Sequence, residues 1–132
     1  MEELYENRLT LGKDPEPLEL ATFICRVLYS KKARNIKLIK IDDKTSVADY
    51  FVLATGTSST HVRSLGDAVE FFTEKFDVSP LRCEGRDNAS WTALDYASVL
   101  VHVFNRESRE FYNLDKLYAD VEPIEVDYEN VD

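Results

Sequence analysis

The chain has 132 residues and a formal net charge of −9, with 44% hydrophobic and 31% charged residues. This is the size and balance of one globular domain, which needs no disulfide or metal ion to fold. No apolar run approaches the roughly 20 residues of a membrane-spanning helix. The acidic start, Met1 to Glu6, is unlike a signal or transit peptide, so we expect a cytoplasmic protein.

Charge also restricts the partners. Six acidic residues and no basic residue lie within residues 119–132, which leaves a net charge of −3 for residues 1–118. Because nucleic acids are bound by clusters of Lys and Arg, we expect little direct nucleic-acid binding, with room only for a local basic patch. An acidic surface is better suited to a basic protein partner.

Metal and cofactor chemistry has little support in the sequence. The two cysteines, Cys25 and Cys83, lie in apolar segments far apart in the chain, and His61 and His102 complete no ligand spacing. We therefore predict that both cysteines are small core residues and that the protein has no metal site and no cofactor. His102 lies inside an apolar run and is expected to be a buried neutral histidine with a hydrogen-bonded neighbour, whereas His61 is expected at the surface.

Periodicity predicts an alternation of helices and strands. Residues 1–13 lack a period and are expected to form a loose arm. Asp14 is a suitable cap and Pro15 suits a first turn, so a helix is predicted from there to about Arg34. After it we predict strands at residues 36–41 and 50–55, joined through a turn at 42–44, and then a helix from Thr57 to Phe76. Three further strands are predicted at 81–84, 91–95 and 99–104, with a loop at 85–88. Helical turns are predicted at 106–112 and 114–118.

The strands at residues 50–55 and 99–104 are apolar throughout, as strands buried on both faces are. They predict an α/β fold, a three-layer sandwich with a mixed five-stranded sheet. Residues 119–132 alternate acidic and apolar side chains around Pro123. We expect an exposed tail, or at best an added edge strand, whose removal leaves the fold intact.

A hydroxyl-rich loop, Gly56-Thr57-Ser58-Ser59, lies between a strand and a helix. The simpler interpretation is a helix cap provided by Thr57 or Ser58, and the alternative is an anion site on the backbone amides. A nucleotidyltransferase would need two or three carboxylates that converge on metal ions. Only Glu84 follows at a suitable place, so catalysis of this kind is disfavoured.

The segment from Trp91 to Tyr96 is the best candidate for a binding surface. Aromatic side chains dominate protein interfaces, and a tyrosine in the turn after Asp95 is difficult to bury. The alternative is that Trp91 belongs to the core. We expect Trp91 and Tyr96 to be exposed and the double substitution to alanine to keep the fold but lose binding.

Several separated blocks occur in a characteristic order: residues 48–62, 80–85, Trp91, 94–96, 101–104 and 107–118. They closely resemble the Iojap family of ribosomal silencing factors, and the match covers roughly residues 15–118. The family pattern usually has glycine after the residue that follows Asp95, where this chain has Ala97. The segments 1–13 and 119–132 fall outside the pattern, which predicts an arm, a domain at 14–118 and an acidic tail.

The resemblance implies a fold related to nucleotidyltransferases and a non-enzymatic function. Family members bind the large ribosomal subunit at its intersubunit face, through large-subunit protein fourteen, and prevent the small subunit from joining. Homodimers are common, and organelle relatives assist ribosome assembly. Carried over by position, the partner-binding residues are Trp91, Leu94, Tyr96, Ser98 and Arg82. Two alternatives stay open: a large-subunit assembly factor, and a nucleotide-binding or nucleotidyltransferase-like enzyme that uses residues 56–60.

Overall fold

The computed structural model describes residues 4–41, 48–85 and 90–131. The predicted turn at 42–44 and residues 86–88 of the predicted loop lie outside these ranges. The elements in chain order are η1 (Tyr5–Arg8), α1 (Pro17–Ser30), β1 (Arg34–Lys40), β2 (Tyr50–Gly56), α2 (Ser59–Glu74), β3 (Arg82–Glu84), β4 (Trp91–Asp95), β5 (Val99–Asn105), α3 (Arg106–Tyr112) and α4 (Leu114–Leu117).

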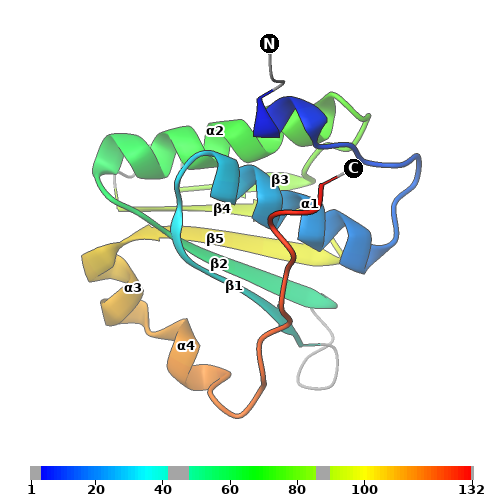
Figure 1. Cartoon of the computed structure of the whole chain (residues 1–132). Coiled ribbons are helices and arrows are strands. Elements are labelled where there is room, and N and C mark those ends of the chain that lie inside the picture. Colours follow the sequence, from blue (N-terminus) through cyan, green and yellow to red (C-terminus); the bar gives the residue numbers. More distant parts are fainter. Residues whose placement is uncertain (1–3, 42–47, 86–89, 132) are drawn as a thin grey trace.

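The strands form one sheet in the order β1-β2-β5-β4-β3 (Figure 1). The central pair, β2 and β5, is parallel, and the other three pairings are antiparallel. Helices α1 and α2 cover one face, while the shorter α3 and α4 lie on the other. The predicted three-layer sandwich with a mixed five-stranded sheet is therefore confirmed. The relation to nucleotidyltransferases stays a prediction.

Helix α1 begins later than predicted. Pro17, and not Pro15, occupies its first turn, because the residue before a proline is held in an extended conformation and Glu16 adopts ψ 153°. Asp14 lies outside the helix with φ 49° and does not cap it. The helix is buried around most of its circumference, including Phe23, Cys25 and Leu28. A helix on the outside of a sheet is buried in this way only where other segments cover its outer side.

The two ends of the chain provide that cover, so the predictions of a loose arm and of an exposed tail were wrong. The alternative of an added edge strand came nearer, since the tail bonds to β1 at one point without forming a strand. Leu9 and Leu11 of the expected loose arm are buried in the core, and η1 packs on α1. The C-terminal segment crosses the edge of the sheet toward α1 (Figure 1). The Ile124 amide donates to the Leu38 carbonyl at 2.8 Å, Tyr128 stacks on Tyr29, and Val131 is buried. We call residues 119–131 the strap.

Candidate interaction surface

The second face of the sheet is covered over only one half. Helices α3 and α4 pack near β1 and β2, where Phe51 contacts Tyr118. Among the described residues no helix lies on this face over β3 and β4, and α3 reaches only the end of β5 (Figure 1). Side chains alternate along the strands, so paired residues share a face. The uncovered half, which we call the open face, is made of Arg82, Glu84, Trp91, Ala93, Asp95, Leu100 and His102.

The open face is slightly hollow, with a depression of about 200 Å³ lined by residues of β3, β4 and β5. At one end Arg82 approaches Asp95, with 3.8 Å between Nη2 and Oδ2, and the Arg82 side chain is 72% exposed. An exposed ion pair at this distance contributes little to stability. The Arg82 guanidinium can therefore exchange its partner when another molecule covers the face, whereas Asp95 also accepts a hydrogen bond from the Ala97 amide.

His102 lies on the open face rather than under the helices. Its ring stacks on Phe104 with centroids 5.8 Å apart, and it meets Phe51 edge-on at 5.2 Å. Burial lowers the pKa of His102, and the nearby carboxylate of Glu84 opposes that shift. The predicted neutral state agrees with this direction. The predicted hydrogen-bonded neighbour was wrong. Within the described part of the chain, the imidazole of His102 makes contacts with aromatic rings but no hydrogen bond.

Trp91 is half-buried at the other end of the open face, opposite Phe104 in the sheet. Gly85 makes this position possible. Its φ is +75°, and a Cβ there would lie 2.8 Å from the Trp91 carbonyl and 2.9 Å from the indole ring. Only glycine both adopts this conformation readily and leaves room for the ring. The backbone at Gly85 thus fixes how Trp91 is presented.

Two other predicted binding residues point inward, which corrects the sequence analysis. Tyr96 is 7% exposed, and its hydroxyl lies 2.8 Å from Thr73 Oγ1 on α2. Leu94 is 1% exposed and belongs to the core under the helices. Both fall on the helix-facing side by strand alternation, since Asp95 between them faces the other way. The expectation that Tyr96 lies exposed was wrong, and its substitution by alanine should not spare the fold.

The turn after β4 keeps its shape with an unusual residue. Ala97 has φ +69°, a conformation that favours glycine, and its amide donates to Asp95 Oδ1 at 2.8 Å. The half-buried Ser98 accepts through its carbonyl from the amides of Asp49 and Tyr50 at 2.9 and 3.1 Å. Ser98 thus joins β5 to the start of β2.

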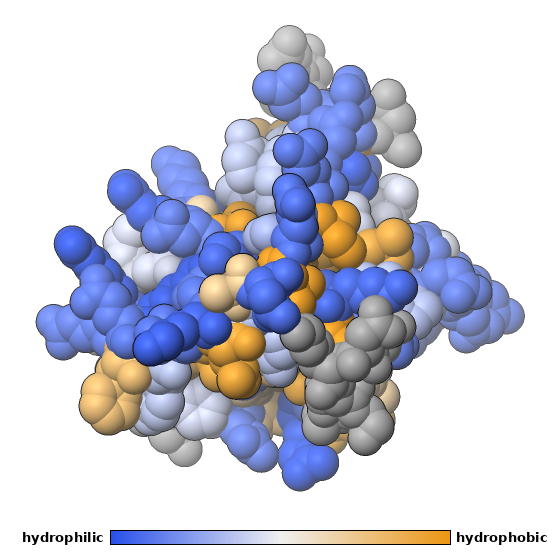
Figure 2. Space-filling model, turned by 90° about the horizontal axis from the view of Figure 1, so that it is seen from below, coloured by the Kyte–Doolittle hydropathy of each residue, from blue (hydrophilic) through white to orange (hydrophobic). Residues whose placement is uncertain are grey.

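Exposed aromatic side chains border the open face, and the sequence analysis did not select them. On α3, Phe111 is 81% exposed and Tyr112 is 55% exposed, and Leu117 on α4 is 65% exposed. Tyr112 also contacts Phe104, which links it to the open face. From below, apolar atoms gather at several places among charged side chains (Figure 2). Adjacent aromatic residues in a short polar helix were the signal, since such a helix cannot bury both.

The hydroxyl-rich loop is a helix cap. Ser58 Oγ accepts from the His61 amide at 3.1 Å, which confirms the simpler interpretation. A Cβ at Gly56 would lie 2.8 Å from Val62, so packing accounts for this glycine. The Thr57 amide donates to His61 Nδ1 at 2.8 Å, and His61 Nε2 lies 2.8 Å from the Lys31 carbonyl. His61 therefore joins the start of α2 to the end of α1. An anion site on the remaining amides stays a prediction.

Arg109 joins the second-face helices to the sheet, a role that the sequence did not indicate. Its guanidinium donates to the Asn35 carbonyl at 2.6 Å, to Thr55 Oγ1 at 2.9 Å and to both oxygens of Asp115. Lys37 lies 2.9 Å from the same carboxylate. The hydrogen bonds from Arg109 lower the pKa of Asp115 to about 2, although burial opposes the shift. The group connects β1, β2, α3 and α4.

Within the described ranges, no three His, Cys, Asp or Glu side chains lie close enough to hold a metal ion. No described helix is long and apolar enough to cross a membrane. Cys25 is fully buried, as predicted, and burial raises the pKa of its thiol to about 12. Cys83 is only half-buried on the edge strand β3, so the prediction of a core residue was wrong there.

The fold and the surface define a small α/β protein whose sheet is half open on one face beside exposed aromatic side chains. Comparison with known proteins identifies the group: the chain belongs to the family described as ribosomal silencing factor during starvation, whose model matches residues 14–132. The match includes the strap, which packs against the domain.

Individual relatives agree. The ribosomal silencing factor RsfS of Bacillus subtilis is 30% identical over 111 residues, covering 84% of this chain and 92% of that protein. The mouse protein named mitochondrial assembly of ribosomal large subunit protein 1 is 30% identical over 101 residues, covering 70% of this chain and 42% of that one. A crystal structure of a Chromobacterium violaceum protein superposes with a TM-score of 0.76 at 25% identity, over 79% of this chain and 87% of that chain.

Proposed function

We propose that this protein is a cytoplasmic regulator that docks on the large ribosomal subunit and prevents the small subunit from joining. The observation that carries the proposal is that the chain belongs to a family of ribosomal silencing factors. The half-open sheet beside exposed aromatic residues offers the docking surface that such a function needs. Large exposed apolar side chains that gather on one side of a domain commonly mark the surface where a partner docks.

The chemistry of the open face indicates what kind of partner it fits. Trp91, Leu100 and His102 provide flat, half-buried contact area, and Phe111 and Tyr112 extend it onto α3. Aromatic residues and arginine are the residues that dominate binding energy at protein interfaces. The acidic balance of the chain favours a basic protein. These features support a ribosomal protein as the direct partner, and the resemblance singles out large-subunit protein fourteen.

Silencing by this route requires no catalysis. An interface of roughly 800 Å² on each partner is enough for a stable complex. The bound domain then occupies space that the small subunit needs, and no acid, base or nucleophile takes part. Because Trp91 and Leu100 on the open face and Phe111 and Tyr112 at its border offer apolar contact area, we also propose that free protein associates with a second copy, which would compete with the ribosome for the same residues.

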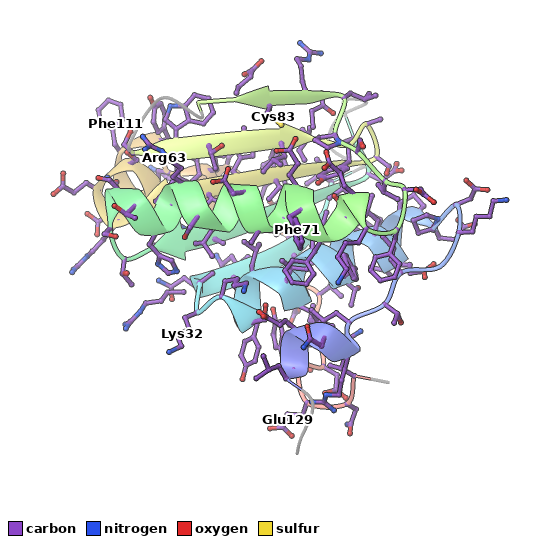
Figure 3. All side chains as sticks on the ribbon, turned by 90° about the horizontal axis from the view of Figure 1, so that it is seen from above. Lys32, Arg63, Phe71, Cys83, Phe111 and Glu129 are labelled. Carbon is purple, nitrogen blue, oxygen red and sulfur yellow. The ribbon has the colours of Figure 1, made fainter. Side chains whose placement is uncertain are left out.

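The test is cosedimentation with purified large subunits, followed by a subunit-joining assay. We expect wild-type protein to travel with large subunits and to reduce the joined-ribosome peak. Phe111→Ala with Tyr112→Ala should weaken binding by about tenfold or more, since aromatic anchors typically contribute over 1 kcal/mol each. Phe71→Ala is the matched control, because Phe71 is 62% exposed on α2, on the helix-covered side of the sheet (Figure 3).

The outcomes are distinct. Wild-type protein that stays at the top of the gradient and leaves joining unchanged would refute the proposed function. Wild-type binding with equal losses in the Phe71 and the α3 variants would refute the assignment of the surface while keeping the function.

A second candidate is an assembly factor for the large subunit. The mouse relative, named mitochondrial assembly of ribosomal large subunit protein 1, supports it. Both functions use the same docking surface, so the variants above do not separate them. Deleting the gene does: a silencing factor changes the ratio of free subunits to joined ribosomes, whereas an assembly factor leaves immature large particles on the gradient.

A further inference from the structure

A second hollow, larger than the depression on the open face, lies away from that face. It has a volume of about 880 Å³ and is found where the parallel strands β2 and β5 end side by side. From this point α2 runs to one face of the sheet and α3 to the other (Figure 1). Such a point, where consecutive connections leave to opposite faces, is where open α/β sheets characteristically bind ligands.

The hollow is basic, although the protein is acidic. Four basic side chains and two acidic ones line it, which gives a local net charge of +2 in a chain of −9. We call it the basic cleft, and its charged residues are Arg34, Lys37, Arg106, Arg109, Glu110 and Asp115.

The cations divide into those with a structural task and those available to a ligand. Arg109 and Lys37 hold the single carboxylate of Asp115. Arg106 pairs loosely with Glu110 at 3.6 Å, and its side chain is 87% exposed. The guanidinium of Arg34 is exposed and has no hydrogen bond or ion pair within the described ranges. Arg34 and Arg106 are thus placed to meet an anion at little cost.

Further positive charge surrounds the cleft. Lys32 and Arg63 lie at the same end of the molecule, where α1 ends and α2 begins (Figure 3). The amino end of the 16-residue helix α2 adds its partial positive charge there. At physiological salt, charges beyond about 8 Å are largely screened, so the acidic remainder of the protein does not cancel this patch.

We propose that the basic cleft binds the phosphate backbone of structured RNA, as a second contact beside the open face; this rests on the proposed docking on a ribosomal subunit. It would make the local basic patch the exception to the expected absence of nucleic-acid binding. The lining residues favour a backbone over a free nucleotide. None of them is aromatic, and Ile36 is the one large apolar residue among them, so a base finds no aromatic ring to stack on.

The contact positions the protein but does not read a sequence. Arginine side chains bind phosphate oxygens in a forked geometry, and such phosphate contacts carry no information about the bases. The open face would then select the ribosomal protein, while the cleft fixes the orientation of the domain on the subunit. Its contribution should depend strongly on salt, because each neutralised phosphate releases condensed counterions.

The test compares two double variants that carry the same reversal of charge at two different sites on the surface. Arg34→Glu with Arg106→Glu changes the basic cleft, and both side chains are exposed, so folding should be spared. Lys13→Glu with Lys75→Glu is the matched control with the same change in net charge, and these two lysines line a different hollow. The affinity of each protein for purified large subunits is measured at 50, 100 and 200 mM potassium chloride.

We expect the affinity of the cleft variant to be lower than that of wild type by a factor of about ten or more at 50 mM salt. The slope of log affinity against log salt should become less steep by roughly 1.5, because two phosphate contacts are lost and each contributes about 0.7–0.9 to the slope. The control should keep the wild-type slope. Equal slopes in all three proteins, with wild type bound, would overturn the cleft proposal and leave the proposed function standing. No binding by wild type would instead remove the proposed function.

A final measurement addresses the small-ligand alternative. Thermal shift with ATP, GTP and pyrophosphate at 1 mM should leave the melting temperature of wild-type protein unchanged. A shift that the Arg34→Glu, Arg106→Glu variant abolishes would overturn the RNA assignment in favour of a phosphorylated small molecule.

Discussion

Substitutions at Tyr96 distinguish most clearly between a structural role and a docking role for this side chain. Its ring lies under α2, and its hydroxyl is 2.8 Å from Thr73 Oγ1. Burial raises the pKa of Tyr96, so the phenol stays protonated at neutral pH. In Tyr96→Phe the ring and its packing remain, and only the buried hydroxyl pair is lost. Thr73 keeps one acceptor, the Glu70 carbonyl at 3.2 Å. The hydroxyl of Thr73 is therefore not left wholly without a partner.

The expected loss is that of one ordinary buried hydrogen bond, about 1 kcal/mol. For a domain of this length that corresponds to a fall of about 3–5 °C in melting temperature. Tyr96→Ala should lose about 3–5 kcal/mol, because it also empties the space of a buried aromatic ring. Urea unfolding followed by circular dichroism measures both. Tyr112→Phe, which removes an exposed hydroxyl, is the matched control and should change stability by less than about 0.5 kcal/mol.

Binding to large subunits completes the experiment. Tyr96→Phe should bind as wild type does, since its hydroxyl points away from the open face. A variant with unchanged stability and lost binding would refute the reasoning, because the hydroxyl would then have to face the partner.

The remaining predictions concern other parts of the fold. The pKa of Asp115, at about 2, lies below its ordinary value of 3.8, so the stabilisation from its ionised form is complete above about pH 4 and is lost as the pH falls toward 2. Asp115→Asn should thus destabilise the protein by about 1 kcal/mol at pH 7. The difference in unfolding free energy between this variant and wild type should shrink between pH 4 and pH 2. A difference that stays constant over this range would contradict the pairing of Asp115 with Arg109. Gly85→Ala should lower the free energy of unfolding by at least about 1 kcal/mol and alter the fluorescence emission spectrum of Trp91, the single tryptophan. An unchanged spectrum would mean that the indole ring does not lie over this glycine. Ala97→Gly should stabilise by about 0.5 kcal/mol in urea unfolding, because φ +69° is strained for alanine, and a loss of stability would argue against that conformation. Removing residues 119–132 should cost on the order of 3 kcal/mol, since several apolar side chains lose their burial; an unchanged melting temperature would restore the view of a free tail.

The sheet could be predicted because its signals are local. Period-two and apolar runs identified the five strands, and β2 and β5 were correctly recognised as central. Their apolar character was nevertheless interpreted too simply. A strand such as β5 carries Leu100 and His102 on a face that α3 and α4 are too short to reach, so burial on both faces was predicted where one face is half open.

The errors at the surface have a common physical origin. Tyr96 was expected to be exposed because it belongs to a turn. Strand alternation, however, places its side chain on the other face of the sheet from that of Asp95, toward α2. The strap and the first residues have no period of their own because their apolar residues pack on α1, a surface that exists only in the folded domain. Arg109 gave no local signal, since its partners Asn35 and Thr55 lie 74 and 54 residues away in the chain.

The strap also limits how this sheet can grow. By bonding to Leu38 it occupies part of the β1 edge, whereas β3, at the opposite side of the described sheet, has no strand beyond it. A sheet with two free edges can add copies without end, and natural proteins block such edges to avoid fibres. With one edge obstructed, strand addition at β3 joins two chains and then stops. Chains that lose the strap would regain a second adhesive edge, so truncated protein should form larger particles at high concentration than the full chain does.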